Sequence, residues 1–200
     1  HQNKMKLNNY NNLLELFFDQ YEKQDKNNIF LINLGNPKHK LSWEKTYLLV
    51  NHLSNQISKD IKLGDRCVLI SENRPEWLIS DLAIMLAGGI SVPSYTTYTT
   101  KDYEYIIKDC EPSVLIVSNN VQFNKIKDIL DYKKIKKIIS FDRLENLKFQ
   151  NYLCIEDIIN KKDGFENFDS EISLKRSDPA CIIYTSGTQG NPKGVILSHG

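Results

Sequence analysis

The chain has 200 residues, which is long enough to bury a core as one domain. Hydrophobic residues make up 40% and charged residues 26%, the composition of an ordinary globular protein. The formal net charge is +1, so the charge balance argues against a nucleic-acid partner.

Targeting and metal signals are weak. Residues 8–12 are polar, unlike a secretory signal, and the apolar stretch 77–90 is shorter than the roughly 20 residues of a membrane helix. The four cysteines and four histidines have no spacing typical of a metal site. We therefore expect reduced thiols, a cytoplasmic location and no metal held by this segment.

The N-terminal part is predicted to contain a helix, a hairpin and a second helix. Apolar residues recur at helical spacing over 13–21. Apolar runs at 29–34 and 40–41 flank a Gly-Asn-Pro turn, which predicts a hairpin. Ser42 is expected to cap a helix with Leu53 and Ile57 on its apolar face.

Helices and strands then alternate. Strands are predicted at 66–71, 90–92, 113–118 and 137–141. Asn73 is expected to cap a helix that has Pro75 in its first turn and ends at Gly88. Pro93 is expected to end the strand that follows. Thr100 is expected to cap the next helix, and another helix is predicted over 121–130.

The predicted strands are apolar throughout, which is typical of strands buried on both faces of a parallel sheet. The fold prediction is therefore an α/β layered domain with a mostly parallel sheet flanked by helices. Residues 160–178 are polar and are expected to form a surface connection. The lysine-rich run 133–137 favours a solvated edge over a nucleic-acid surface.

The residues that point to a chemistry lie near the C-terminal end. A strand pattern over 180–185 leads into the sequence SGTQGNPKG, and residues 195–197 are apolar again. Glycines allow backbone N–H groups to approach a polyanion, hydroxyl groups add donors, and Lys193 adds a mobile positive charge. This composition predicts a phosphate-binding loop. A plain hairpin turn, the alternative, needs fewer glycines and no lysine.

The loop differs from a Walker A loop, in which Gly-Lys-Ser/Thr leads directly into a helix. Here Lys193 is followed by Gly194 and then by β-branched residues. The phosphate loop is therefore expected between two strands, where a helix dipole contributes little to anion binding.

Residues 184–195 (YTSGTQGNPKGV) resemble the phosphate-loop signature of the adenylate-forming superfamily, which includes acyl-CoA synthetases. Residues 73–77 (NRPEW) and 87–93 (AGGISVP) resemble N-terminal segments of that family, and 87–98 is most similar to its long-chain branch. The chain starts at His1 and stops at Gly200, directly after the motif. The resemblance thus implies that residues 1–200 are an incomplete N-terminal portion of the large AMP-binding (adenylating) domain, truncated after the phosphate loop.

The same resemblance implies ATP-dependent activation of a carboxylic acid, expected to be a long-chain fatty acid, to acyl-adenylate and then acyl-CoA. The small molecules implied are the fatty acid, ATP with Mg²⁺, and coenzyme A. The adenine, ribose, Mg²⁺ and CoA residues are expected beyond this chain, so the fragment alone should be inactive. The implied phosphate contacts are Thr185, Ser186, Gly187, Thr188, Gln189, Gly190 and Lys193, with Lys193 as the catalytic charge.

Several alternatives stay open. Gln189 replaces the threonine or serine usual in the family, which implies altered nucleotide affinity and favours a non-catalytic relative. An enzyme that loads an amino or aryl acid onto a carrier protein is another alternative. Trp77 and Tyr95 could line an acyl tunnel, although core packing is expected for Trp77. His199 is expected to pack at a strand end. A long-chain substrate would involve peripheral membrane contact, and the sequence gives no oligomeric state.

Overall fold

The computed structural model describes residues 29–34, 39–161, 179–185 and 193–198. The helix expected over 13–21, His199 and most of the surface connection expected over 160–178 lie outside these residues. Within the described residues, no helix is long and apolar enough to cross a membrane.

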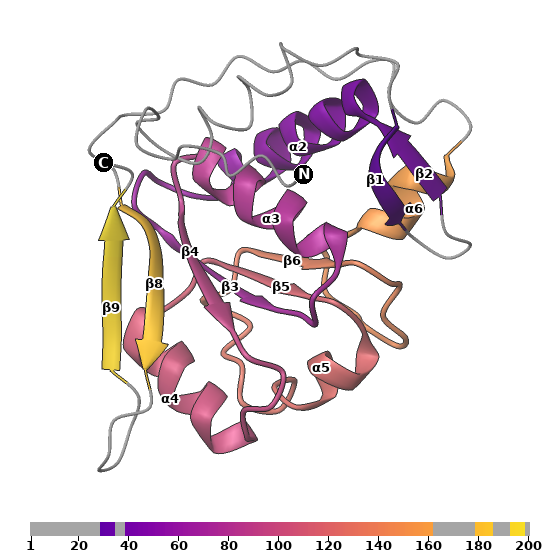
Figure 1. The fold of residues 1–200 in the computed structure, drawn as a ribbon. Coiled ribbons are helices and arrows are strands. Elements are labelled where there is room, and N and C mark those ends of the chain that lie inside the picture. Colours follow the sequence, from indigo (N-terminus) through magenta and orange to yellow (C-terminus); the bar gives the residue numbers. More distant parts are fainter. Residues whose placement is uncertain (1–28, 35–38, 162–178, 186–192, 199–200) are drawn as a thin grey trace.

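A sheet forms the centre of the molecule, with the strand order β7-β6-β5-β3-β4-β8-β9 (Figure 1). Each neighbouring pair is parallel except β8 and β9, which are antiparallel. The prediction of a mostly parallel sheet is therefore confirmed. The strands are β3 (Arg66–Ile70), β4 (Ile90–Ser94), β5 (Val114–Val117), β6 (Lys137–Ser140), β7 (Tyr152–Cys154), β8 (Pro179–Thr185) and β9 (Lys193–Ser198).

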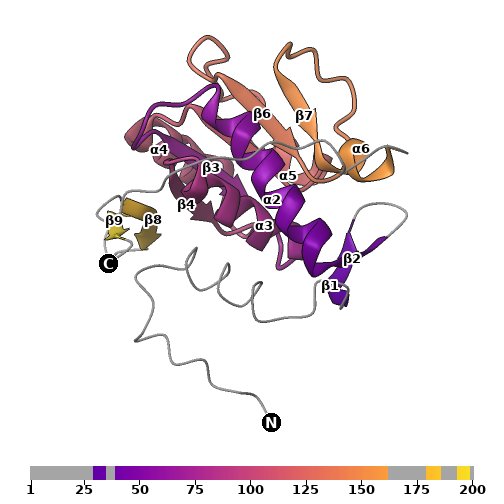
Figure 2. The same ribbon diagram turned by 90° about the horizontal axis from the view of Figure 1, so that it is seen from above.

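Helices cover both faces of this sheet, as predicted. Figures 1 and 2 place α2, α3 and α6 on one face and α4 and α5 on the other. Side chains alternate between two cores along β3, because Leu69 packs with α2 and α3 whereas Ile70 packs with α4. The helices are α2 (Trp43–Ser58), α3 (Pro75–Leu86), α4 (Thr100–Cys110), α5 (Asn120–Asn124) and α6 (Ile155–Asn160).

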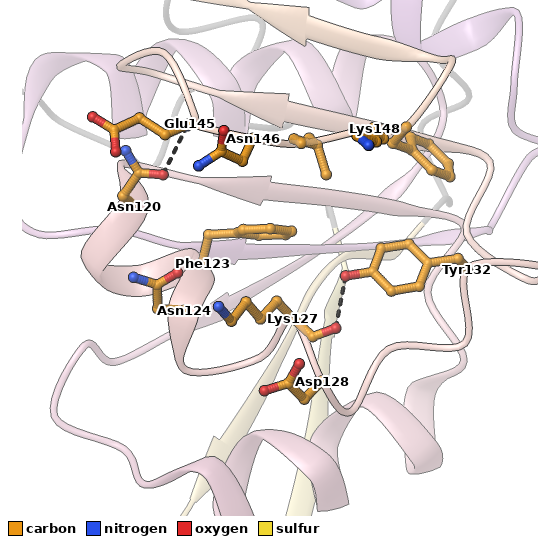
Figure 3. Close-up of a pocket in the computed structure, with 11 residues that line it drawn as sticks. Asn120, Phe123, Asn124, Lys127, Asp128, Tyr132, Glu145, Asn146 and Lys148 are labelled. Carbon is orange, nitrogen blue, oxygen red and sulfur yellow. Dashed lines mark hydrogen bonds between the residues drawn. The ribbon is translucent and has the colours of Figure 1, made fainter.

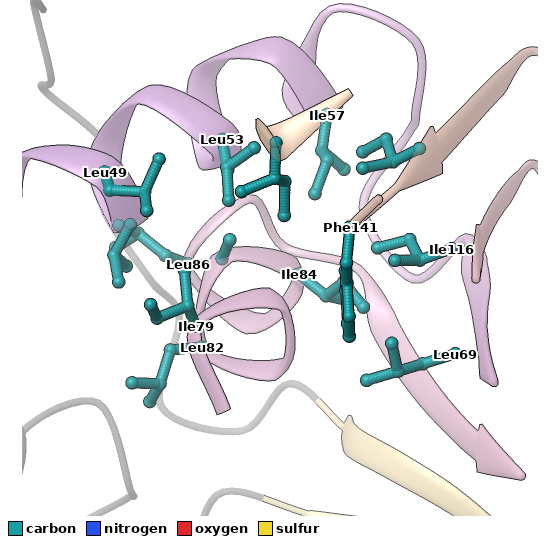
Figure 4. Close-up of a cluster of buried hydrophobic side chains, with 14 of the residues drawn as sticks. Leu49, Leu53, Ile57, Leu69, Ile79, Leu82, Ile84, Leu86, Ile116 and Phe141 are labelled. Carbon is teal, nitrogen blue, oxygen red and sulfur yellow. The ribbon is translucent and has the colours of Figure 1, made fainter. Parts of the chain in front are cut away.

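The larger core lies beneath α2 and α3 (Figure 4). Leu53 and Ile57 of α2 are at most 1% exposed, and they face the sheet together with Ile84 of α3. Phe141, which follows β6, is fully buried in the same cluster. Complete burial of one such side chain contributes roughly 1.5–3 kcal/mol, so this packing fixes both helices on the sheet.

The predicted hairpin and the cap that follows it are confirmed. Strands β1 (Ile29–Leu34) and β2 (His39–Ser42) form an antiparallel pair apart from the main sheet. The Ser42 hydroxyl accepts a hydrogen bond from the backbone N–H of Lys45 at 3.2 Å, which satisfies a free donor in the first turn of α2.

Three predicted boundaries are wrong by a few residues. Arg74, not Asn73, is the N-cap of α3, and it makes no side-chain capping bond because a guanidinium has no hydrogen-bond acceptor. Pro93 lies inside β4 opposite Leu69, since the pairing with β3 continues to Ser94. Thr99, not Thr100, caps α4.

Thr99 and Asp102 cap α4 by bonding to each other's backbone, which explains why the cap is Thr99 and not Thr100. The Thr99 hydroxyl accepts from the Asp102 backbone N–H at 3.3 Å, and the Thr99 backbone N–H donates to the Asp102 carboxylate at 2.9 Å. Such a capping box satisfies two donors at once, which a cap at Thr100 would not do.

A helix is present where one was predicted over 121–130, but the predicted end is wrong, because α5 ends at Asn124. Beyond it, most backbone hydrogen bonds span three residues, from Ile126 N to Phe123 O and from Ile129 N to Ile126 O, both at 3.0 Å, and one four-residue bond joins Lys127 N to Phe123 O at 2.9 Å. These bonds define tight turns instead of an α-helix. Strand β7 and helix α6 have no counterpart in the sequence prediction.

The solvated edge expected over 133–137 is wrong at its last residue. Lys137 is 4% exposed, and its ammonium group lies 2.9 Å from the Asp60 carboxylate. It also donates to the Asn151 side chain at 3.0 Å. Paired and hydrogen-bonded in this way, the charge can remain inside the sheet layer.

Candidate phosphate-loop site

The segment predicted to bind phosphate connects two adjacent antiparallel strands. Thr185 at the end of β8 pairs with Lys193 at the start of β9, so residues 186–192 join the two strands. The prediction that this loop lies between strands is confirmed. Ser186, Gly187, Thr188, Gln189 and Gly190 lie outside the described residues, as do the side chains of Thr185 and Lys193.

The position of the loop in the sheet is favourable for a ligand. Strand β8 is parallel to β4, which is parallel to β3, so the loop leaves the sheet at the edge where these strands have their carboxyl ends (Figure 1). Ligands of open parallel sheets bind outside this edge. The edge therefore brings the end of β8, where the predicted loop begins, close to the segments that follow β3 and β4.

A pocket of about 470 Å³ lies at the same edge. That volume is within the range of roughly 300–1,000 Å³ typical of small-molecule sites. Trp77 lines the pocket and also packs against the larger core, so the core packing expected for it is confirmed. The full lining is Ser71, Glu72, Asn73, Trp77, Pro93, Ser94, Tyr95, Thr96, Thr97, Ile183 and Tyr184.

Glu72 places a carboxylate on the pocket wall. Its side chain accepts a hydrogen bond from the Gln122 amide at 2.7 Å. Burial acts to raise the pKa of Glu72, but neighbouring hydrogen bonds, including that from Gln122, bring the pKa below its ordinary value. The group is therefore ionised at neutral pH, and the pocket wall disfavours a second anion.

Tyrosines connect the end of β8 to the helix layer. The Tyr98 hydroxyl donates to the backbone carbonyl of Tyr184 at 3.2 Å. The Tyr184 hydroxyl in turn donates to the Asp109 carboxylate of α4 at 2.8 Å. Burial, followed by this hydrogen bond, raises the pKa of Tyr184, so the phenol stays protonated and keeps its donor role.

Two other pockets belong to different places. One of about 260 Å³ lies behind Tyr184 and includes Arg66 and Gly194. Another of about 670 Å³ lies between α5 and residues 145–149, towards the opposite end of the sheet from β8 (Figure 3). Its charges are mixed, because Lys127 and Lys148 share it with Asp128 and Glu145. No residue predicted from the sequence for phosphate binding lines it.

The part of the chain that the structure describes holds no group of three His, Cys, Asp or Glu side chains able to bind a metal ion. Cys67, Cys110 and Cys154 are buried free thiols. Burial raises the pKa of Cys110 to about 12, so this thiol stays neutral and unreactive.

The sequence pattern did not indicate the roles of Tyr98, Asp109 and Glu72. The repeated tyrosine and threonine pattern over 95–100 marked an unusual segment next to a strand end. It did not reveal that Tyr98 would contact a residue 86 positions later in the chain. Only the pairing of β8 beside β4 brings the two together.

The sequence is similar to those of known enzymes. A family model described as AMP-binding enzyme matches residues 17–200. The long-chain-fatty-acid–CoA ligase ACSBG1 of Rattus norvegicus is 32% identical over 171 residues, which cover 80% of this chain and 24% of that protein. The long-chain-fatty-acid–CoA ligase ACSBG2 of Xenopus laevis is 33% identical over 173 residues, covering 82% of this chain and 23% of that protein.

A solved structure has the same fold. The anthranilate CoA ligase AuaEII, in complex with anthranoyl-AMP, superposes with a TM-score of 0.73 at 23% sequence identity. The match covers 98% of this chain and 36% of that chain. The chain thus spans about a quarter of the length of the two ligases above and about a third of this solved structure.

Proposed function

Because the chain belongs to the family of AMP-binding enzymes, we propose that the protein activates a carboxylic acid with ATP and transfers the acyl group to coenzyme A. The observation that carries the proposal is the loop rich in glycine and hydroxyl groups between β8 and β9, at the ligand-binding edge of a parallel sheet.

In the first step, a carboxylate oxygen of the acid attacks the α-phosphorus of ATP, and the bond to the bridging oxygen breaks. Acyl-adenylate forms and pyrophosphate leaves. In the second step, the sulfur of coenzyme A attacks the acyl carbon, AMP leaves with the bonding electron pair, and the thiol proton goes to solvent. Two anions meet in the first step, so charge neutralisation at the phosphates is the main demand on the protein.

The loop residues are suited to that demand. Backbone N–H groups near Gly187 and Gly190, with the neighbouring hydroxyls, would contact the β- and γ-phosphates, and Lys193 would neutralise charge on the departing pyrophosphate. The pairing of Thr185 with Lys193 supports this role, because it holds the two ends of the loop side by side. Mg²⁺ would arrive with ATP, which it usually accompanies through phosphate oxygens.

We propose a long-chain fatty acid as the acid substrate. The relatives reported above carry that substrate class in their names. The pocket beside the loop offers Trp77, Pro93 and Ile183 as apolar walls, and the ionised Glu72 disfavours an anionic group there. Such a pocket suits an uncharged chain better than a second carboxylate or a phosphate.

The acceptor would be coenzyme A rather than a carrier protein, since the relatives are named CoA ligases. The reaction would take place in the cytoplasm, where the three described cysteines would remain free thiols. Transient contact with a membrane surface would supply a substrate of low solubility.

The proposal is tested by ATP–pyrophosphate exchange with the full-length protein, using acids of increasing chain length. Exchange that depends on added acid and is strongest with long-chain fatty acids supports it, and acyl-CoA formation tests the second step. Exchange with amino or aryl acids alone would mean that the substrate is an acid of that class and not a long-chain fatty acid. No exchange with any acid would identify a non-catalytic nucleotide-binding protein.

A further inference from the structure

We infer that Tyr98 is a positioning residue for the phosphate loop, because its hydroxyl group holds β8 at the point where that loop begins. The inference rests on the proposed role of the loop in binding ATP. It adds a residue from a distant part of the chain, which would act on the nucleotide only through the backbone of β8.

Tyr98 bonds to the end of β8 from the segment that follows β4. Strand β4 is parallel to β8, with Ser91 opposite Cys181. Further along β8, the backbone carbonyl of Tyr184 accepts a hydrogen bond from the Tyr98 hydroxyl at 3.2 Å. Tyr98 thus adds a hydrogen bond to the β8 backbone one residue before that strand ends at Thr185.

Tyr98 is itself held in place. Its ring contacts the ring of Tyr95 edge to face at 5.5 Å between centroids, and that of Tyr103 at 5.9 Å. Tyr103 is fully buried in α4, and its hydroxyl donates to the backbone carbonyl of Tyr95. Aromatic pairs at these distances stabilise one another, so the Tyr98 hydroxyl is directed at β8 by a rigid neighbourhood.

Tyr184 also contacts β9, the strand that follows the loop. It pairs with Gly194, the second residue of β9. A Cβ atom on Gly194 would lie 3.3 Å from ring atoms of Tyr184 and 3.1 Å from Ile182, so the ring packs directly over the glycine backbone. With its hydroxyl bonded to Asp109 at 2.8 Å, the Tyr184 side chain ties β9 to α4.

Both hydrogen bonds therefore hold Tyr184 of β8, and β9 is held beside it through strand pairing and the packing of the Tyr184 ring on Gly194. Binding a polyanion to several backbone N–H groups requires those groups to be held in one arrangement before the ligand arrives. Loss of the Tyr98 hydroxyl should then weaken ATP binding while leaving the separate acid-binding step unaffected.

The test uses Tyr98→Phe in the full-length protein, with Tyr132→Phe as the matched control. The Tyr132 hydroxyl also donates to a backbone carbonyl, that of Lys127 at 2.6 Å, but in the pocket between α5 and residues 145–149. We expect Tyr98→Phe to raise the KM for ATP about two- to tenfold, the effect of one neutral hydrogen bond, with the KM for the acid unchanged. Tyr132→Phe should change neither.

Asp109 provides a second pair of variants. Asp109→Ala removes the acceptor of the Tyr184 hydroxyl and should raise the KM for ATP, whereas Asp109→Asn retains a carbonyl acceptor and should restore most of the affinity. Equal effects of Tyr98→Phe and Tyr132→Phe, or an equal rise in the KM for ATP and for the acid, would overturn the positioning role.

Amide hydrogen exchange separates this inference from the proposed function. In the Tyr98→Phe protein, a peptide covering residues 182–196 should exchange faster than in the Tyr132→Phe protein, with or without enzyme activity. If this peptide exchanges its amide hydrogens faster while the wild type shows no ATP–pyrophosphate exchange activity, the proposed function fails, but the role of Tyr98 in holding β8 is supported. If the amide hydrogens of the peptide exchange at the same rate in both variants, the role of Tyr98 in holding β8 is rejected.

Discussion

Arg74 and Asp142 are 68 residues apart in the sequence, yet the guanidinium donates to both oxygens of that carboxylate, at 2.9 and 2.8 Å. The bidentate pair links the start of α3 to the segment after β6. Arg74 also bonds to Glu76 and lies over the ring of Phe141 at 5.4 Å. These carboxylates, Asp142 first, raise the pKa of Arg74, so its charge is permanent.

Removing this arginine should be costly. In Arg74→Ala, the Glu76 carboxylate, whose residue is 1% exposed, loses its cationic partner inside the protein. We expect a loss of roughly 3–5 kcal/mol in the free energy of unfolding, measured by urea denaturation. Asp142→Ala should cost less, because Arg74 keeps Glu76. A larger loss in Asp142→Ala than in Arg74→Ala would contradict the arrangement.

Asp81 should make stability depend on pH. It is 7% exposed in α3, and burial raises its pKa from 3.8 to about 6. A carboxyl whose pKa is raised on folding favours the folded state below its unfolded pKa, and that stability is lost as the pH rises through about 6. The loss amounts to about 3 kcal/mol at 1.36 kcal/mol per pKa unit.

The check is the pH dependence of unfolding between pH 4 and 7. Asp81→Asn should lack the decline in stability that the wild type shows over this interval. Asp128→Asn, at an exposed position, is the control variant. Parallel profiles for the wild type and Asp81→Asn would show that Asp81 does not titrate in this range.

Leu53 should be a major contributor to the core beneath α2. It is 1% exposed, whereas Leu63 is 55% exposed. Leu53→Ala should lower the free energy of unfolding by roughly 2–5 kcal/mol, through lost burial and the cavity left behind. Leu63→Ala should change it by about 0.5 kcal/mol or less. Similar denaturation midpoints for the two variants would mean that α2 is not packed as described.

Lys193 should contribute to the adenylation step rather than to folding. Loss of a charged hydrogen bond to phosphate costs roughly 1.5–3 kcal/mol, so Lys193→Ala should slow ATP–pyrophosphate exchange about 10- to 100-fold in the full-length protein. Lys148→Ala, an exposed lysine on the far pocket, should leave the exchange rate unchanged. Undiminished exchange in Lys193→Ala would refute its catalytic role.

Hydrophobic periodicity and turn signals were sufficient to place most elements where structure is decided locally, although two of the three predicted caps were one residue off. The hairpin before Ser42, the alternation of strands and helices, and the placing of the loop between two strands all follow from residues that are close in sequence. The burial of a charged side chain was mispredicted where distant partners decide the outcome. Lys137 is buried because Asp60 and Asn151 meet it, and no pattern in the lysine-rich run encodes that.

The candidate site divides in the same way. The loop itself was visible as a motif, because glycines, hydroxyls and a lysine must be contiguous to surround a polyanion. The side chains that support it come from elsewhere: Tyr98 follows β4, and Asp109 lies in α4. Neither has a local signature, since a tyrosine hydroxyl can serve any nearby carbonyl.

The place of β8 in the sheet has a consequence for biosynthesis. Its neighbour β4 is synthesised long before β8. Strands β5, β6 and β7 and their helices lie between β4 and β8 in the chain. Joining distant segments carries a loop-closure cost and slows the step in which they meet. We therefore expect the nascent chain to assemble the layer from β3 to β7 first, leaving one side of β4 as an open edge until the hairpin of β8 and β9 emerges and covers it.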